Sequence, residues 1–186
     1  MKIGVDIDDT ITNSWLTFSK EYSKVLDIPE EELNKEKPYY SNVIKEKYTM
    51  EEYFEKIKPV NDKLTPILPL KEEVKEVIDK LYELGHTITF ITARGKETSN
   101  PYETTKNYLD SHNIRYEKLI LAPLNKAKAC LDEKIDLFID DSTKHCTKVS
   151  QVGIEVLMFE TKYNKDFPNF KHVTSWNEIY ENIKNR

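Results

Sequence analysis

The stretch Lys2-Ile-Gly-Val-Asp-Ile-Asp-Asp-Thr-Ile11 joins an apolar run to a cluster of acidic side chains. The run is rich in Val and Ile and contains no residue that would break a strand, so it predicts a buried β-strand. The run ends in three carboxylates and a hydroxyl, which are Asp6, Asp8, Asp9 and Thr10. Removing carboxylates from water costs several kcal/mol unless a partner compensates their charge. A divalent cation is the simplest such partner, so the stretch predicts a metal site at the end of a strand.

The chain beyond residue 70 alternates between predicted helices and predicted strands. Apolar periodicity and turn residues predict strands over 86–91, 119–121, 136–139 and 155–159. The same signals predict helices over 74–84, 102–112, 126–131 and 144–152, with a last helix that begins at Ser175. Alternation of this kind favours an α/β fold in which a parallel sheet is covered by helices on both faces.

Three pairs of polar residues stand at the carboxyl ends of predicted strands. In parallel α/β sheets, ligands bind outside these ends. The sequence therefore predicts one site built from the pairs Asp6 and Asp8, Thr92 and Arg94, and Asp140 and Asp141.

Residues 28–68 differ from the rest of the chain because they are rich in Glu, Lys and Tyr. Thr49 followed by Glu52 predicts the capped start of a helix within them. We interpret this segment as a small helical cap inserted after the first strand. The expected organisation is a catalytic core of residues 1–27 and 69–186 with a cap of residues 28–68.

Asp6-Ile-Asp8-Asp9-Thr10 after an apolar strand resembles the first motif of the haloacid-dehalogenase-like phosphatases. The three later motifs of that superfamily follow in order, carried by Thr92, Lys126 and the pair Asp140-Asp141. The surrounding residues are most similar to the bacterial 5'-nucleotidases related to the 5'(3')-deoxyribonucleotidases. The resemblance covers about residues 1–160 and implies a three-layer, Rossmann-like fold.

The resemblance implies a role for each carboxylate. Asp6 is the expected nucleophile, which forms an aspartyl-phosphate and divides hydrolysis into two easier steps. Asp8 is the expected general acid and base. The expected cofactor is Mg²⁺, which prefers carboxylate, carbonyl and water oxygens. Its expected ligands are Asp6, the backbone carbonyl of Asp8, and the pair Asp140 and Asp141, of which Asp141 is favoured as the direct ligand.

Thr92, Lys126 and Arg94 are the expected phosphate-binding residues. Thr92 offers a hydroxyl and a backbone N–H to a phosphate oxygen. Lys126 holds the nucleophile and the phosphate together, although Lys128, two residues further along the same helix, is an alternative. For Arg94, a second phosphate contact and a surface position are equally compatible with the sequence.

Aromatic residues in or beside the cap are candidate contacts for the rest of the substrate. A nucleobase stacks well on aromatic rings, and the aromatic residues of this region are Trp15, Tyr39, Tyr40, Tyr48, Tyr53 and Phe54. The candidates for substrate contact are Trp15, Tyr39 and Tyr40. The alternative is that these rings form the core of the small insert.

Composition excludes several other classes of protein. The chain has 186 residues and a formal net charge of -5, which disfavours a protein that binds nucleic acid polymers. It has no apolar run of about 18 residues, so no membrane partner is expected. Its start within the first strand and its two cysteines without metal spacing favour a cytoplasmic location. The oligomeric state is open, a homo-oligomer included.

The sequence therefore predicts a Mg²⁺-dependent phosphomonoesterase that acts on (deoxy)nucleoside monophosphates. One alternative is a phosphatase of sugar phosphates or of another small phosphorylated metabolite. A second alternative is a non-catalytic module that binds a phosphorylated ligand. Asp8 argues against this module, because binding alone needs no acid or base at that position.

Overall fold

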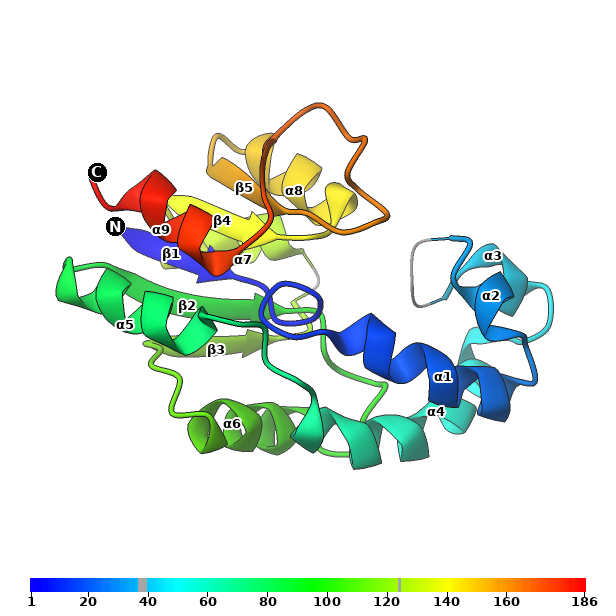
Figure 1. Cartoon of the computed structure of the whole chain (residues 1–186). Helices are drawn as coiled ribbons and strands as arrows, with labels where there is room; N and C mark the ends of the chain where they lie inside the picture. The colour runs from blue at the N-terminus through cyan, green and yellow to red at the C-terminus, as the bar shows by residue number, and fades with distance from the viewer. Residues whose placement is uncertain (37–39, 124) are drawn as a thin grey trace.

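A single parallel sheet forms the centre of the molecule (Figure 1). The computed structural model describes residues 1–36, 40–123 and 125–186. The six strands are β1 (Lys2–Val5), β2 (Thr87–Thr92), β3 (Lys118–Leu121), β4 (Leu137–Asp140), β5 (Glu155–Phe159) and β6 (Lys171–Val173). Their order is β3-β2-β1-β4-β5-β6, and all five pairings are parallel. The prediction of an α/β fold with a parallel sheet is confirmed.

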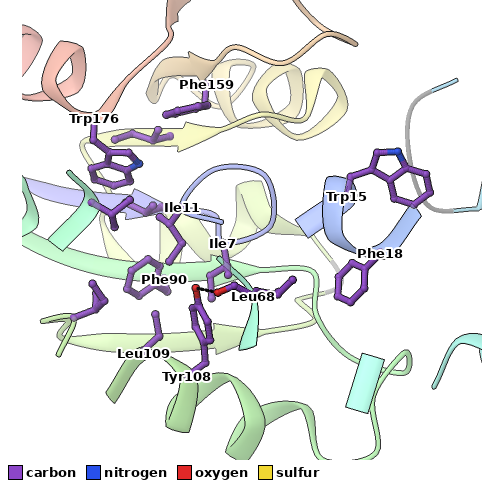
Figure 2. Close-up of a cluster of buried hydrophobic side chains, with 14 of the residues drawn as sticks. Ile7, Ile11, Trp15, Phe18, Leu68, Phe90, Tyr108, Leu109, Phe159 and Trp176 are labelled. Carbon is purple, nitrogen blue, oxygen red and sulfur yellow. Dashed lines mark hydrogen bonds between the residues drawn. The ribbon is translucent and has the colours of Figure 1, made fainter. Parts of the chain in front are cut away.

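Helices cover both faces of this sheet. One face packs against α5 (Val74–Glu83), α6 (Pro101–Ser111) and α9 (Trp176–Ile183), through a large apolar cluster that includes Phe90 and Leu109 (Figure 2). The other face packs against α7 (Lys126–Glu133) and α8 (Thr143–Ser150), through a second cluster that includes Phe138 and Met158. Successive residues of a strand face opposite sides, which divides the core into these two clusters. The predicted three-layer arrangement is therefore confirmed.

The central strand β1 is buried along all but its first residue. It pairs with β2 on one side and with β4 on the other. Ile3 and Val5 have no exposed surface. At Gly4, an added Cβ would lie 2.9 Å from Cδ2 of Phe138, so only glycine fits without movement of the core. This packing fixes the direction in which the chain leaves the sheet at Asp6.

A set of helices stands at one end of the sheet, on the side of the strands' carboxyl ends (Figure 1). It comprises α1 (Ser14–Leu26), α2 (Glu30–Leu33), α3 (Asn42–Lys45), α4 (Met50–Leu64) and the 3₁₀ turn η1 (Thr65–Ile67). α1 packs along α4, and we call this set the helical insert. The chain enters and leaves it at a narrow neck, where Thr12 and Leu70 form an antiparallel bridge. The division into a core of 1–27 and 69–186 and a cap of 28–68 stays a prediction.

The strand β6 is a feature that the sequence analysis missed. It pairs with β5 at the edge of the sheet through Lys171, His172 and Val173. Three residues are too few to show an alternating pattern, and two of them are polar. Its position follows from the loop 160–170, which brings the chain back beside β5.

Among the described residues, no helix combines the length and the apolar character that crossing a membrane requires.

The capped start of α4 is a direct test of local stability. Thr49 accepts a hydrogen bond from the N–H of Glu52, and the Glu52 side chain accepts from the N–H of Thr49, which confirms the predicted capping box. We expect Thr49→Ala to lower the free energy of unfolding by about 1 kcal/mol in urea titrations. The matched control is Ser41→Ala, because Ser41 precedes α3 without a side-chain cap hydrogen bond. Equal losses in both variants would contradict this account of the cap.

Candidate active site

One cavity of about 300 Å³ lies between the carboxyl ends of the strands and the helical insert. Asp6 and Asp8 follow β1, Thr92 ends β2, and Asp140 ends β4. Lys126 is the first residue of α7, whose preceding residue Asn125 caps the helix by accepting a hydrogen bond from Ala127 N. The predicted site residues that line the cavity are Asp6, Asp8, Tyr40, Thr92, Arg94, Lys126, Asp140 and Asp141. The fold thus brings together side chains from five separate parts of the sequence.

Lys126 is buried between two carboxylates. Its Nζ donates to Oδ1 of Asp6 at 2.5 Å and to Oδ2 of Asp140 at 2.7 Å. Although burial lowers the pKa of Lys126, the carboxylates of Asp140 and Asp6 raise it further, so the net shift is upward. Lys128 instead pairs with Asp132 on the exposed side of the helix. The geometry therefore favours Lys126 over Lys128 as the lysine of the site.

The environment of Asp6 opposes its ionisation. Burial is the largest effect and raises the pKa of Asp6, and the nearby carboxylates of Asp140 and Asp8 raise it as well. The ammonium group of Lys126 lowers it, and the result is a pKa of about 7. A cation beside Asp6 would favour the charged carboxylate that nucleophilic attack requires.

Asp8 has a different set of partners. Nε and Nη2 of Arg94 donate to its two oxygens at 2.9 and 2.8 Å, and Ser14 Oγ donates to Oδ1 at 2.5 Å. Burial raises the pKa of Asp8, but the Arg94 guanidinium and the hydrogen bonds from Arg94 and Ser14 outweigh it and lower the pKa overall. Arg94 is almost completely buried, so the alternative of a surface arginine is wrong. Its predicted contact with phosphate stays a prediction.

Three carboxylates form a group that could hold a metal ion. Oxygens of Asp6, Asp140 and Asp141 lie within 4.8 Å of one another. Asp140 is fully buried, and its Oδ1 accepts from Ser142 N at 2.7 Å while its Oδ2 accepts from Lys126. Asp141 is only partly buried, and its backbone carbonyl accepts from Asn164 Nδ2. An all-oxygen donor set of this kind fits Mg²⁺.

The other end of the cavity is largely aromatic. Phe18 and Tyr22 of α1 line it, together with Tyr53, Phe54 and Ile57 of α4. Tyr40, which precedes α3, completes this lining. Trp15 is not among the lining residues. It packs edge-on against Tyr22, and its Nε1 donates to Asn34, so it supports the wall from behind. Tyr39, the third aromatic candidate, lies outside the described residues.

The sequence analysis named Tyr53 among the aromatic residues of the cap but missed other residues of the cavity wall. Tyr53, Ile57, Asn61 and Thr65 recur at intervals of four along α4 and just beyond its end, and all four line the cavity. The available signal was that Asn61 continues the helical spacing of the apolar residues Tyr53 and Ile57. Glu97, on the loop after β2, also lines the cavity and had no pattern that could have marked it. The same holds for Ser14, which does not line the cavity but donates to Asp8 from the start of α1.

Comparison with solved structures agrees with this fold. The fold is similar over 100% of the chain to that of a predicted phosphatase from Clostridium acetobutylicum (TM-score 0.74, 15% identity, 98% of that chain). It is also similar to a haloacid dehalogenase-like hydrolase from Streptococcus pneumoniae (TM-score 0.70, 14% identity, 97% of each chain). The chain therefore shares the fold of these haloacid-dehalogenase-like structures.

Sequence comparisons define the family more narrowly. The whole chain, residues 1–186, matches the family model for 5' nucleotidase, deoxy (pyrimidine), cytosolic type C protein. A nucleotidase from Clostridium acetobutylicum is 31% identical over 185 residues, which cover 97% of this chain and 92% of that protein. The chain belongs to this 5'-nucleotidase family and is a phosphoric monoester hydrolase.

Replacing Lys126 tests the buried ion pairs. We expect Lys126→Met to lower the free energy of unfolding by about 3 kcal/mol in EDTA, because two buried carboxylates lose their partner. Lys128→Met removes the same group from an exposed pair and should change stability by less than about 0.5 kcal/mol. Urea titrations of both variants provide the comparison. A small effect at Lys126 would contradict its role in holding the strand ends.

The raised pKa of Asp6 predicts a pH dependence in the absence of metal. The folded carboxyl has a pKa of about 7, above its ordinary value of 3.8, so the folded state binds more protons between these values. The Asp6 contribution to stability therefore falls as pH rises from about 4 through 7.

Urea titrations from pH 4 to 8 in EDTA measure this dependence. Asp6→Asn should lose stability less steeply with rising pH than the wild-type protein does. Adding Mg²⁺ to the wild-type protein should also flatten the slope, because a cation favours the ionised carboxylate. Identical slopes for the wild type and Asp6→Asn would rule out an abnormal Asp6.

Proposed function

We propose that the protein is a Mg²⁺-dependent 5'-nucleotidase that hydrolyses (deoxy)nucleoside monophosphates through a phosphorylated Asp6. One observation carries the proposal. A single cavity combines buried carboxylates and cations at its strand end with aromatic side chains at its insert end. These two ends match the two halves of a nucleotide, a charged phosphate and a planar apolar base.

The proposed reaction has two steps. In the first, an oxygen of Asp6 attacks phosphorus, and the bond from phosphorus to the sugar oxygen breaks. Asp8 gives a proton to that leaving oxygen. In the second, Asp8 takes a proton from water, the water oxygen attacks phosphorus, and the bond to Asp6 breaks. Phosphate leaves, and both carboxyl groups return to their starting states.

Lys126 and Thr92 position the phosphate in this proposal. Lys126 lies 2.5 Å from Asp6, so it can neutralise charge on both the nucleophile and an attached phosphoryl group. Thr92 ends β2 beside the cavity and offers its backbone N–H and its hydroxyl. The metal would be held by Asp6, Asp141 and the Asp8 carbonyl, with Asp140 orienting Lys126. When bound, it supplies positive charge that reduces repulsion between Asp6 and the phosphate.

Arg94 controls when Asp8 can act as an acid. In this structure its guanidinium holds Asp8 in the charged form through two hydrogen bonds. A phosphate beside Arg94 would compete for the same guanidinium, because arginine binds phosphate with matching geometry. Sharing Arg94 would raise the pKa of Asp8 and allow it to carry the proton for the leaving oxygen.

The cavity favours a single phosphate group. The lysine and arginine side chains among its described lining residues, Lys126 and Arg94, both stand at the strand end. The aromatic end offers no further ammonium or guanidinium group among those residues for a second phosphate. A sugar phosphate without a base would leave this aromatic wall uncovered, which makes it the weaker candidate. The helical insert beside the cavity also disfavours nucleic acid polymers. A cytoplasmic location stays a prediction, and the oligomeric state stays open, a homo-oligomer included.

Phosphate release from a panel of substrates tests the proposal. The panel contains 5'- and 3'-(deoxy)nucleoside monophosphates and sugar phosphates, each measured with Mg²⁺ and with EDTA. We expect turnover to concentrate on nucleotides, to require Mg²⁺ and to fall by at least about 1,000-fold in Asp6→Asn.

Other outcomes have distinct meanings. Turnover that is spread over sugar phosphates would keep the mechanism and reject the nucleotide. Absence of turnover in a folded, metal-loaded protein would favour the binding module. Lys128→Met serves as the control variant, since its exposed ammonium group lies outside the cavity.

A further inference from the structure

Glu97 is a carboxylate that the proposed mechanism does not use. It lies on the loop between β2 and α6, is partly buried, and lines the cavity. The four other acids that line the cavity in the described part of the chain follow β1 or β4, and they are Asp6, Asp8, Asp140 and Asp141. Glu97 therefore comes from a different loop than the proposed catalytic and metal-binding carboxylates.

The position of Glu97 is fixed from two sides. Its Oε1 accepts a hydrogen bond from Gly95 N at 2.6 Å, and its backbone carbonyl accepts from Asn61 Nδ2 at 3.0 Å. Asn61 is itself held by the Tyr22 hydroxyl, which donates to Asn61 Oδ1 at 2.7 Å. Two further bonds tie the loop to α4, from Ser99 N and Oγ to Asp62. The Glu97 side chain is thus held by the loop itself, and the backbone of this loop is held against α4.

A carboxylate here weakens the site for an anion. Burial raises the pKa of Glu97, and the nearby Asp8 carboxylate raises it further. Arg94 also lies close enough to Glu97 to lower that pKa in part, which places Glu97 near the phosphate end. Repulsion between Glu97 and a bound phosphate reduces affinity. A hydrogen-bond donor on the organic part of the ligand would offset this cost.

The place of Glu97 along α4 indicates which part of the ligand it meets. Thr65 lies where the insert returns to the sheet. Asn61 precedes Thr65 by about one helical turn, which places it about 6 Å further from the sheet along the helix axis. The backbone carbonyl of Glu97 accepts a hydrogen bond from Asn61, so this residue of the loop lies beside Asn61, whereas Tyr53 lies two turns beyond on α4. Glu97 therefore stands between the phosphate end and the aromatic end, where the sugar of a nucleotide would lie.

We propose that Glu97 is a specificity-determining residue, which accepts a hydrogen bond from a sugar hydroxyl and repels a second phosphate on that sugar. This inference rests on the proposed nucleotidase function. A neutral hydroxyl donates to the carboxylate, but a phosphate in the same place brings a like charge. The site thus selects nucleoside monophosphates and rejects nucleoside bisphosphates.

Binding in an inactive background tests this inference without requiring turnover. Calorimetry with Mg²⁺ measures the affinity of Asp6→Asn for a deoxynucleoside 5'-monophosphate and for its 3',5'-bisphosphate. We expect the monophosphate to bind at least about tenfold more tightly. Adding Glu97→Gln keeps an oxygen for Gly95 N but removes the charge, and should reduce this preference by about tenfold.

The matched control is Glu103→Gln in the same background. Glu103 is exposed in the first turn of α6, so its loss changes the net charge equally without changing the cavity. The control should leave the preference within about twofold.

An unchanged preference in Glu97→Gln, or an equal change in Glu103→Gln, would overturn the inference. Turnover of the monophosphate by the wild-type protein reports separately on the nucleotidase proposal. A changed binding preference without any turnover would reject catalysis and still support the role of Glu97.

Discussion

The ammonium group of Lys126 holds together the ends of two neighbouring strands. It donates to Asp6, which follows β1, and to Asp140, which ends β4. These side chains are almost completely buried, so each charge depends on the others for compensation. Three carboxylates close enough to share a metal ion would repel one another strongly without this cation. The arrangement of the whole strand end therefore depends on one lysine at the start of α7.

A second ion pair connects the sheet to the helical insert. Arg94 follows β2 and binds Asp8 through two hydrogen bonds, while Ser14, the first residue of α1, binds the same carboxylate. Asp8 thus joins the strand end to the helix that begins the insert. The neck formed by Thr12 and Leu70 lies next to this junction in the chain. A phosphate that competes for Arg94 would act on the contact between the two parts of the molecule.

The residues explain why most of the fold could be predicted and part of the site could not. The strands β1, β2 and β4 are short apolar runs that end in polar residues, and such runs identify both the sheet and its functional edge. Lys126 and Thr92 were identified because the four motifs of the resembled superfamily follow one another in the chain. A single lysine or threonine at the end of a helix or strand does not by itself indicate a functional site.

Other contacts depend on tertiary structure alone. Arg94 meets Asp8 across 86 positions of sequence, and no local pattern specifies that pair. Glu97 lies in a polar loop, where a carboxylate is usually solvated. Trp15 lies beside the cavity wall instead of on it, since helical periodicity identifies a buried face but not which neighbour that face contacts.

Trapping the covalent intermediate is the most direct test of the central claim that Asp6 is the nucleophile. The protein is denatured during turnover of a nucleoside monophosphate with Mg²⁺, and borohydride then reduces any acyl phosphate to an alcohol. Peptide mass spectrometry should find this reduction at Asp6, and it should be absent without substrate. Reduction at Asp8, or at no residue while phosphate is released, would contradict the account.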